Sequence, residues 1–158
     1  MSGLSSLKDA VKILNANTSR ADFLGPVSDD DLSKSSELIG LEFPPSYEAF
    51  LKQLGVGAFS DAEFYGIIAN KVPGTSAPSV TWRTLDDRET AGLPHHLVPI
   101  MSSGYGPLFC LDASNRSDDG EYAVVLWEPS NDESNPPQLI ADSFGDFFLN
   151  EIKSRIRT

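Results

Sequence analysis

Three groups of residues in this 158-residue sequence have side chains that can do chemistry. His95 and His96 are adjacent and offer the imidazole nitrogens of a zinc ligand or a general base. Cys110 is the single cysteine, the residue type of a thiolate nucleophile. Aspartates gather at 29–31 and 112–119, and their carboxylates are ligands that calcium prefers. Zinc binding, thiol catalysis and calcium binding are therefore the chemistries that the residue types allow.

The positions of the histidines and the cysteine favour structural roles. Neighbouring residues of an extended chain point to opposite sides, and no second histidine pair or further cysteine completes a zinc site. We therefore expect His95 and His96 in a surface turn after Pro94. Cys110 lies in the apolar run 108–111, which is typical of a buried, inert thiol. A Cys-His dyad stays open as the weaker alternative, because no orienting or oxyanion feature accompanies it.

The aspartate-rich segments also favour structural explanations. Residues 29–31 follow Ser28, so we expect a solvated first helical turn in which the helix dipole favours negative charge. Segment 112–118 lacks the glycine of a calcium loop and has Arg116 where an oxygen ligand belongs. No pair of carboxylates is marked by its spacing as an acid and a base. We predict that the protein is not an enzyme and uses no metal or cofactor.

The glycines of Gly55-Val56-Gly57 suggest either a phosphate loop or the end of a helix. A phosphate loop needs a strand before it and a helix after it. Here the order is reversed, because Pro45 can begin a helix and a strand is expected over 63–68. The apolar stripe of that helix has i, i+3, i+4 and i+7 spacing and comprises Tyr47, Phe50, Leu51 and Leu54. Gly55 is thus predicted to cap the helix.

Predicted helices fill the chain up to residue 54, predicted strands follow from residue 64, and a last helix is predicted near the C-terminus. Helical periodicity predicts helices over about 6–16, 28–40, 45–54 and 144–156, with capping boxes at Ser6/Asp9 and Ser143/Asp146. Short apolar runs predict strands over 64–68, 80–85, 97–101, 108–111, 122–127 and 138–141. Residues 115–120 form the strongest turn signal, and 71–79 and 130–137 are predicted loops. The pattern indicates one domain over residues 1–158.

The net charge of the chain limits the kinds of partner that it can bind. The chain has 23 acidic and 12 basic residues, for a formal net charge of −11. Such a chain repels nucleic acid and is steered toward a basic partner, although acidity also simply keeps a small protein in solution. The sequence contains no secretion signal and no stretch long enough to span a membrane. We therefore expect a cytoplasmic protein that binds neither nucleic acid nor membranes.

The stretch around Pro45 resembles a known signature. The SUKH superfamily has Leu-Pro-x-x-Tyr-x-x-Phe-Leu followed by Asn-Gly-Gly, and this chain has Phe43-Pro44-Pro45-Ser46-Tyr47-Glu48-Ala49-Phe50-Leu51 followed by Leu54-Gly55-Val56-Gly57. Phe43 stands where leucine is usual, which is a conservative change, and the asparagine before the glycines is absent. Further matches follow in family order at 64–66, 99–100, 104–106, 108–112, 123–128 and 141–148. The resemblance covers about residues 28–152.

The resemblance implies a fold and a kind of function. The implied fold is a single α+β domain, in which N-terminal helices and a C-terminal helix flank a mixed or largely antiparallel sheet. The superfamily includes bacterial immunity proteins of polymorphic toxin systems and fungal regulators of the Smi/Knr kind, and no reaction is attached to its motif. We expect an immunity protein that binds and neutralises a cognate, basic toxin domain such as a nuclease. The alternative is an intracellular adaptor or cell-wall-regulatory binding module of the Smi/Knr type.

Candidate contact residues are those with charge or an aromatic ring at predicted strand ends and turns. Tryptophan and tyrosine are common interface anchors, because each offers a large apolar area with a polar handle. Trp127 follows four apolar residues, so a place in the core is an equal alternative. The predicted partner-binding residues are Glu63, Tyr65, Tyr105, Asp112, Asp118, Asp119, Trp127 and Glu128.

Overall fold

Helices and short antiparallel strands build the fold in the computed structural model, which describes residues 2–76 and 78–156. The α-helices are α1 (Gly3–Asn15), α2 (Asp29–Ile39), α3 (Pro45–Gln53), α4 (Val80–Thr90) and α5 (Phe144–Ile156). The strands are β1 (Ala21–Phe23), β2 (Gly57–Phe59), β3 (Ala62–Phe64), β4 (Leu97–Ser102), β5 (Leu108–Arg116), β6 (Tyr122–Trp127) and β7 (Gln138–Ala141). A single 3-10 turn, η1 (Thr18–Arg20), precedes β1 among the described residues. The predicted α+β class is confirmed.

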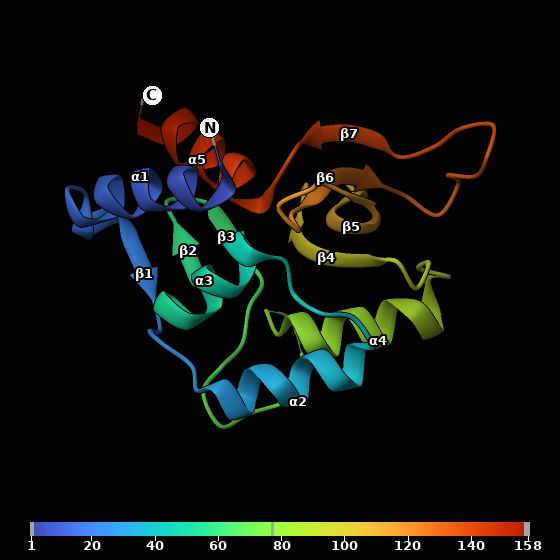
Figure 1. Ribbon diagram of the computed structural model, residues 1–158, viewed down its shortest axis with the longest axis horizontal. Helices are drawn as coiled ribbons and strands as arrows, with labels where there is room; N and C mark the ends of the chain where they lie inside the picture. The colour runs from blue at the N-terminus through green and yellow to red at the C-terminus, as the bar shows by residue number, and fades with distance from the viewer. Residues whose placement is uncertain (1, 77, 157–158) are drawn as a thin grey trace.

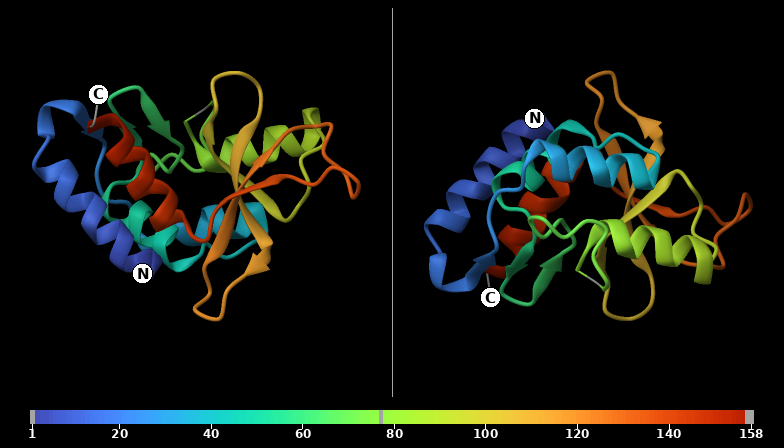
Figure 2. Two further views of the ribbon diagram at one scale, coloured as in Figure 1. Left: turned by 90° about the horizontal axis from the view of Figure 1, so that it is seen from above. Right: turned by 90° about the horizontal axis from the view of Figure 1, so that it is seen from below.

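The strands form two antiparallel sheets, with the orders β1-β2-β3 and β4-β5-β6-β7. In Figure 1 the smaller sheet lies on the left beside α1 and α5, while α2 and α4 lie below the edge strand β4. The β4–β5 loop and the β5–β6 turn emerge at opposite ends of the larger sheet (Figure 2). This arrangement decides which of the predicted contact residues can share a surface.

Local capping signals correctly predict most helix ends. The Ser28 side chain accepts a hydrogen bond from the Asp31 backbone N–H at 3.1 Å, and Gly40 ends α2 with a φ of +82°. Ser143 caps α5 in the same way. The predicted start of the first helix is wrong, because Ser2 is its cap and Ser6 lies inside it.

The predicted strand over 80–85 is wrong, because these residues begin helix α4. Ser79 caps this helix by accepting from the Trp82 backbone N–H at 3.2 Å. The buried face of α4 is largely polar, so the apolar helical period that would have revealed it is missing. Thr84 donates to the Val80 carbonyl at 2.7 Å, and Thr81 shares a 2.5 Å hydrogen bond with Ser35 of α2. Hydrogen bonds inside this interface thus replace the usual apolar stripe.

Two further expectations are corrected in the loops. Of the strand expected over 63–68, only residues 63 and 64 belong to a sheet, as part of β3, and Gly66 then forms an isolated parallel bridge with Ser79. Asp31 was expected to be solvated but is 4% exposed, and its carboxylate accepts from the Asn70 backbone N–H at 2.9 Å. It therefore holds the loop that follows β3. In the predicted loop 71–79, residue 77 lies outside the described residues.

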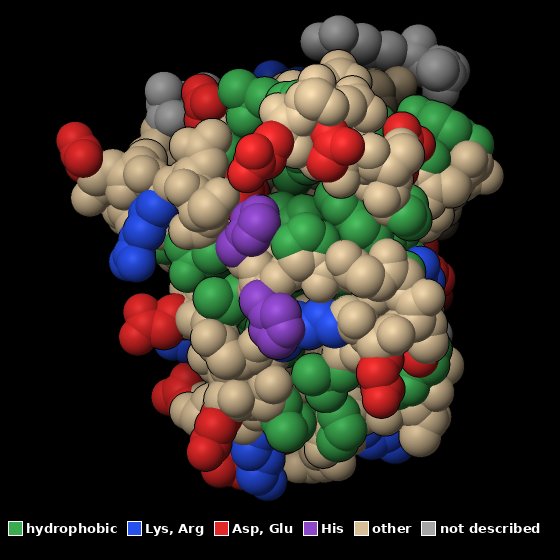
Figure 3. All heavy atoms as spheres, turned by 90° about the vertical axis from the view of Figure 1, so that its right-hand side faces the viewer, with side chains coloured by type: hydrophobic (Ala, Val, Ile, Leu, Met, Phe, Trp, Pro, Cys, Tyr) green, Lys and Arg blue, Asp and Glu red, His purple; other side chains and the backbone are tan. Residues whose placement is uncertain are grey.

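Two hydrophobic clusters support the fold. The main one joins all the α-helices to both sheets. The smaller one comprises Leu93, Leu97, Leu108, Cys110, Val125 and Trp127. Figure 3 looks onto the right-hand side of the molecule, where both histidines (purple) lie near exposed hydrophobic side chains and carboxylates. None of the helices within the described residues is long and apolar enough to cross a membrane.

Candidate functional site

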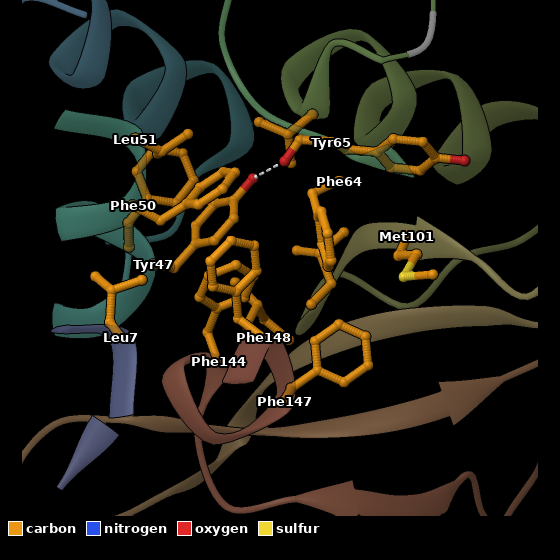
Figure 4. Packing of buried hydrophobic residues seen from close by; sticks show 14 of the residues in the cluster. Leu7, Tyr47, Phe50, Leu51, Phe64, Tyr65, Met101, Phe144, Phe147 and Phe148 are labelled. Carbon is orange, nitrogen blue, oxygen red and sulfur yellow. Dashed lines mark hydrogen bonds between the residues drawn. The ribbon is translucent and has the colours of Figure 1, made fainter. Parts of the chain in front are cut away.

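The motif segment around Pro45 builds the aromatic core. Tyr47 and Phe50 are both fully buried, and their rings stack with centroids 5.7 Å apart. Phe144 and Phe148 of α5 pack against Phe50 at 5.0 and 5.3 Å (Figure 4). The Tyr47 hydroxyl donates a 2.7 Å hydrogen bond to the Tyr65 carbonyl. The motif residues Tyr47 and Phe50 therefore have a structural role in the core.

Gly55 confirms the interpretation of Gly55-Val56-Gly57 as the end of a helix. Its φ is +72°, and a Cβ atom there would lie 2.2 Å from the Gly25 carbonyl oxygen. A Cβ on Gly57 would lie equally close to the Asp22 carbonyl oxygen. Both glycines thus let the segment before α2 approach the end of α3.

The structure separates the predicted contact residues by exposure. Tyr65 and Trp127 are only 3% and 4% exposed, so Trp127 takes the core position that was its equal alternative. Neither ring protrudes from the surface as an anchor would. Asp112 is half-buried and accepts from the Ser114 backbone N–H at 2.9 Å. The exposed members are Glu63, Tyr105, Asp118, Asp119 and Glu128.

The exposed members do not meet on one surface. Glu63 lies on the three-stranded sheet. Tyr105 and Glu128 lie together at one end of the larger sheet, where both line a hollow of about 210 Å³. Asp118 and Asp119 lie in the β5–β6 turn at the opposite end. Of these three locations, the β5–β6 turn is the one that lies beside further carboxylates.

The β5–β6 turn borders a hollow of about 440 Å³, which we call the acidic hollow. Its walls come from the turn, from the start of α1 and from the start of α5. The lining residues are Gly3, Ser117, Asp118, Asp119, Glu121, Asp142, Ser143 and Asp146. Five of these carry a carboxyl group, and none of the described lining residues is Lys or Arg.

Glu121 fixes the floor of the acidic hollow to the start of α3. It is 3% exposed, and its carboxylate accepts from the Ser46 backbone N–H at 3.0 Å and the Ser46 hydroxyl at 2.9 Å. The same hydroxyl accepts from the Gly145 backbone N–H at 2.9 Å, which joins α5 to this network. Burial raises the pKa of Glu121, and the hydrogen bonds from Ser46 lower it only in part.

The close approach of α1 to α5 brings two helix starts to the acidic hollow. A Cβ on Gly145 would lie 1.8 Å from the Gly3 carbonyl oxygen, so this contact requires glycine. The Ser6 hydroxyl of α1 donates to the Asp146 carboxylate of α5. Ser143 accepts from the Asp146 backbone N–H at 3.1 Å. The Asp146 carboxylate is thus held at the start of α5 by a hydroxyl of α1.

Asp119 is oriented within its own turn. Its carboxylate accepts from the Ser117 hydroxyl and, at 3.3 Å, from the Glu121 backbone N–H. The hydrogen bond from Ser117 is the main cause that lowers the pKa of Asp119. Asp119 therefore stays ionised to lower pH than an ordinary aspartate does.

The chemistry that this arrangement offers is recognition of a cation. Within residues 2–76 and 78–156, no three His, Cys, Asp or Glu side chains are grouped to hold a metal ion. An arginine or lysine side chain of a partner instead matches preorganised carboxylates, through charge-assisted hydrogen bonds. The nucleophile that the sequence offers lies elsewhere, because Cys110 is fully buried and burial raises its pKa well above the ordinary value.

Sequence reasoning found Asp118 and Asp119 but missed the other members of the acidic hollow. Glu121 directly follows that turn, and its partner Ser46 is 75 residues away in sequence. Asp146 was recognised only as part of a helix cap. The one local signal for Glu121 was its position directly after Asp118-Asp119-Gly120, which extends the acidic turn by one residue.

Comparison with protein-family models agrees with this fold and with the motif order. The SUKH model described as SMI1-KNR4 cell-wall matches residues 7–153, which is nearly the whole chain. The match includes the motif at 43–57, both sheets and most of α5. The chain belongs to this SMI1-KNR4 family of the SUKH superfamily.

Proposed function

We propose that the protein is an immunity protein that binds a cognate toxin domain in the cytoplasm and blocks its action. The observation that carries this proposal is the acidic hollow on a SUKH fold of net charge −11. Toxins that cleave nucleic acid must present basic surfaces to phosphates. A preorganised acidic surface is complementary to such a groove and competes with the nucleic acid for it.

The inhibition proposed is occlusion and involves no catalytic step. The carboxylates of Asp118 and Asp119 are exposed, while hydrogen bonds from Ser46 and Ser6 hold the carboxylates of Glu121 and Asp146. An Arg or Lys of the toxin groove enters the acidic hollow, and the surrounding surface covers the groove. Binding is therefore expected to weaken as salt concentration rises.

Rescue of intoxicated cells tests this function. The proposal implies that a neighbouring gene encodes the toxin domain, and this domain is produced in cells with and without the protein. We expect growth to be restored, and we expect the two purified proteins to form a complex that protects the nucleic acid substrate. If cells that produce the toxin still fail to grow, although this protein is folded and present at normal levels, the proposal is overturned.

A regulatory binding module is the second candidate, and the SMI1-KNR4 cell-wall description of the family favours it. Such a module would bind a partner of the producing cell itself. Deleting the gene distinguishes the two functions. An immunity protein is dispensable when its toxin is absent, whereas loss of a cell-wall regulator should sensitise growing cells to cell-wall stress without any toxin.

A further inference from the structure

A second hollow beside the larger sheet is partly lined by apolar residues. We call it the Trp127 hollow, and its volume is about 250 Å³. It lies between the loop from α4 to β4 and the loop from β6 to β7. The lining residues are Pro94, His96, Leu97, Trp127, Asn131, Asp132, Glu133 and Pro137. Figure 3 looks onto this side of the molecule.

The Trp127 hollow has the size of one side chain. Clefts that hold drug-sized molecules have volumes of about 300 to 1,000 Å³, so this hollow is below their range. Leu97 and Trp127 belong to the second hydrophobic cluster, and Pro94 and Pro137 complete the apolar part of the lining. A single large apolar side chain therefore fits the volume and the chemistry of the lining.

Trp127 lines the hollow and carries an indole N–H donor. The residue is 4% exposed, and no hydrogen bond from this N–H is found among the described residues. A backbone carbonyl of a bound extended segment can accept from it, as buried Trp side chains ordinarily require.

The polar side of the Trp127 hollow carries two carboxylates, beside His96 and Asn131. Asp132 and Glu133 are exposed and both line it. The Asp132 carboxylate accepts from the Ser134 and Asn135 backbone N–H groups, each at 2.9 Å, which fixes the loop. The hydrogen bonds from Ser134 and Asn135 also lower the pKa of Asp132 from its ordinary value. Carboxylates beside an apolar hollow are complementary to a positive charge next to an apolar side chain.

We infer that the Trp127 hollow binds an extended segment of a partner protein, in which a large apolar side chain stands next to arginine or lysine. The apolar side chain enters the hollow, a backbone carbonyl accepts from the Trp127 indole, and the cation pairs with Asp132 or Glu133. A second copy of this chain does not fit, because both copies carry a net charge of −11. The inference names a second contact of the complex proposed above, and it rests on that function for the partner's identity.

Three capped tripeptides test the hollow without the toxin. Arg-Trp-Arg carries both features, Glu-Trp-Glu keeps only the ring and Arg-Ala-Arg keeps only the charge. Each is titrated into the nitrogen-15-labelled protein, and amide and indole resonances are followed by NMR. We expect Arg-Trp-Arg to shift the Trp127 indole and the Asn131 and Glu133 amides, with a dissociation constant of about 1 mM. The Trp82 indole on α4 serves as an internal control.

Two charge-reversal variants complete the test. Glu133→Lys should weaken Arg-Trp-Arg about fivefold, the order expected when an exposed ion pair becomes a like-charge contact. Glu89→Lys makes the same change of charge at an exposed position on α4 outside the hollow, and it should leave binding nearly unchanged. Equal binding of all three peptides, equal effects of the two variants, or no shift at about 10 mM peptide would overturn the inference. Because no toxin is present, these results are independent of the rescue of intoxicated cells.

Discussion

The hydroxyl of Tyr47 on α3 donates a 2.7 Å hydrogen bond to the backbone carbonyl of Tyr65, inside the main core. Tyr47 has no exposed surface, and Tyr65 continues directly from the end of β3. This bond links the motif helix to the chain that leads toward α4. It explains in physical terms why the segment has a tyrosine rather than a phenylalanine at this position.

Removing this hydroxyl should destabilise the fold. Tyr47→Phe leaves the Tyr65 carbonyl without this donor in a buried place, and we expect a loss of about 1 to 3 kcal/mol in the free energy of unfolding. Urea denaturation measures it. Tyr105→Phe is the control, because Tyr105 is 74% exposed and its change should stay within about 0.5 kcal/mol. Equal stabilities of the two variants would show that the bond contributes nothing.

A second prediction separates backbone conformation from close contact at two glycines. Gly55 and Gly92 have nearly equal φ angles of +72° and +70°, but a Cβ at Gly92 meets no atom within 4 Å. Gly92→Ala should cost about 1 kcal/mol for the left-handed conformation alone. Gly55→Ala must also displace the backbone of Gly25, and we expect a total of about 2 to 4 kcal/mol. Thermal denaturation of both variants gives the comparison, and a smaller loss at Gly55 would contradict the packing described.

The third prediction concerns the pH dependence of stability at Glu121. Burial raises the pKa of its carboxyl, so the folded state binds this proton more tightly than the unfolded chain does. The stability that Glu121 contributes is present in full below its unfolded pKa of about 4.3 and is lost as pH rises through its higher folded pKa. Glu121→Gln does not titrate and keeps an oxygen for Ser46.

The stability of Glu121→Gln relative to the parent should therefore increase from pH 4 to pH 7. Urea denaturation at several pH values measures this difference, in which the other titrating groups largely cancel. Glu89→Gln, at an exposed position, should give a flat difference. A relative stability of Glu121→Gln that falls with rising pH would show that the buried carboxylate is favoured as an anion.

Features set by neighbouring residues were predictable from the sequence, and features set by distant contacts were not. Ser28 begins α2 and Gly40 ends it, each through a hydrogen bond within one helical turn. These two residue types alone therefore predict the helix ends. Helix α4 was missed because its inner side uses Thr81 and Thr84, whose β-branched side chains favour a strand. Packing against α2 through Ser35 decides the outcome there.

The candidate site shows the same division. The acidic turn at Asp118 and Asp119 was visible in the sequence, whereas its joining to α1, α3 and α5 was not. Glu121 meets Ser46 across 75 residues, and Ser6 meets Asp146 across 140 residues. The residues next to Trp127 did not decide between a core position and an interface position, because an aromatic residue at a strand end suits both.

Association kinetics show whether the acidic hollow steers the protein to a basic toxin. Stopped-flow rates with the cognate toxin domain are measured at low and high salt for Asp118→Asn/Asp119→Asn and for the control Asp29→Asn/Asp30→Asn on α2. Both variants remove two negative charges from exposed positions. We predict that the first variant associates about three to ten times more slowly at low salt and has a flatter salt dependence, while the control stays close to the parent. Identical rates and salt slopes for the two variants would contradict a role of the acidic hollow in binding.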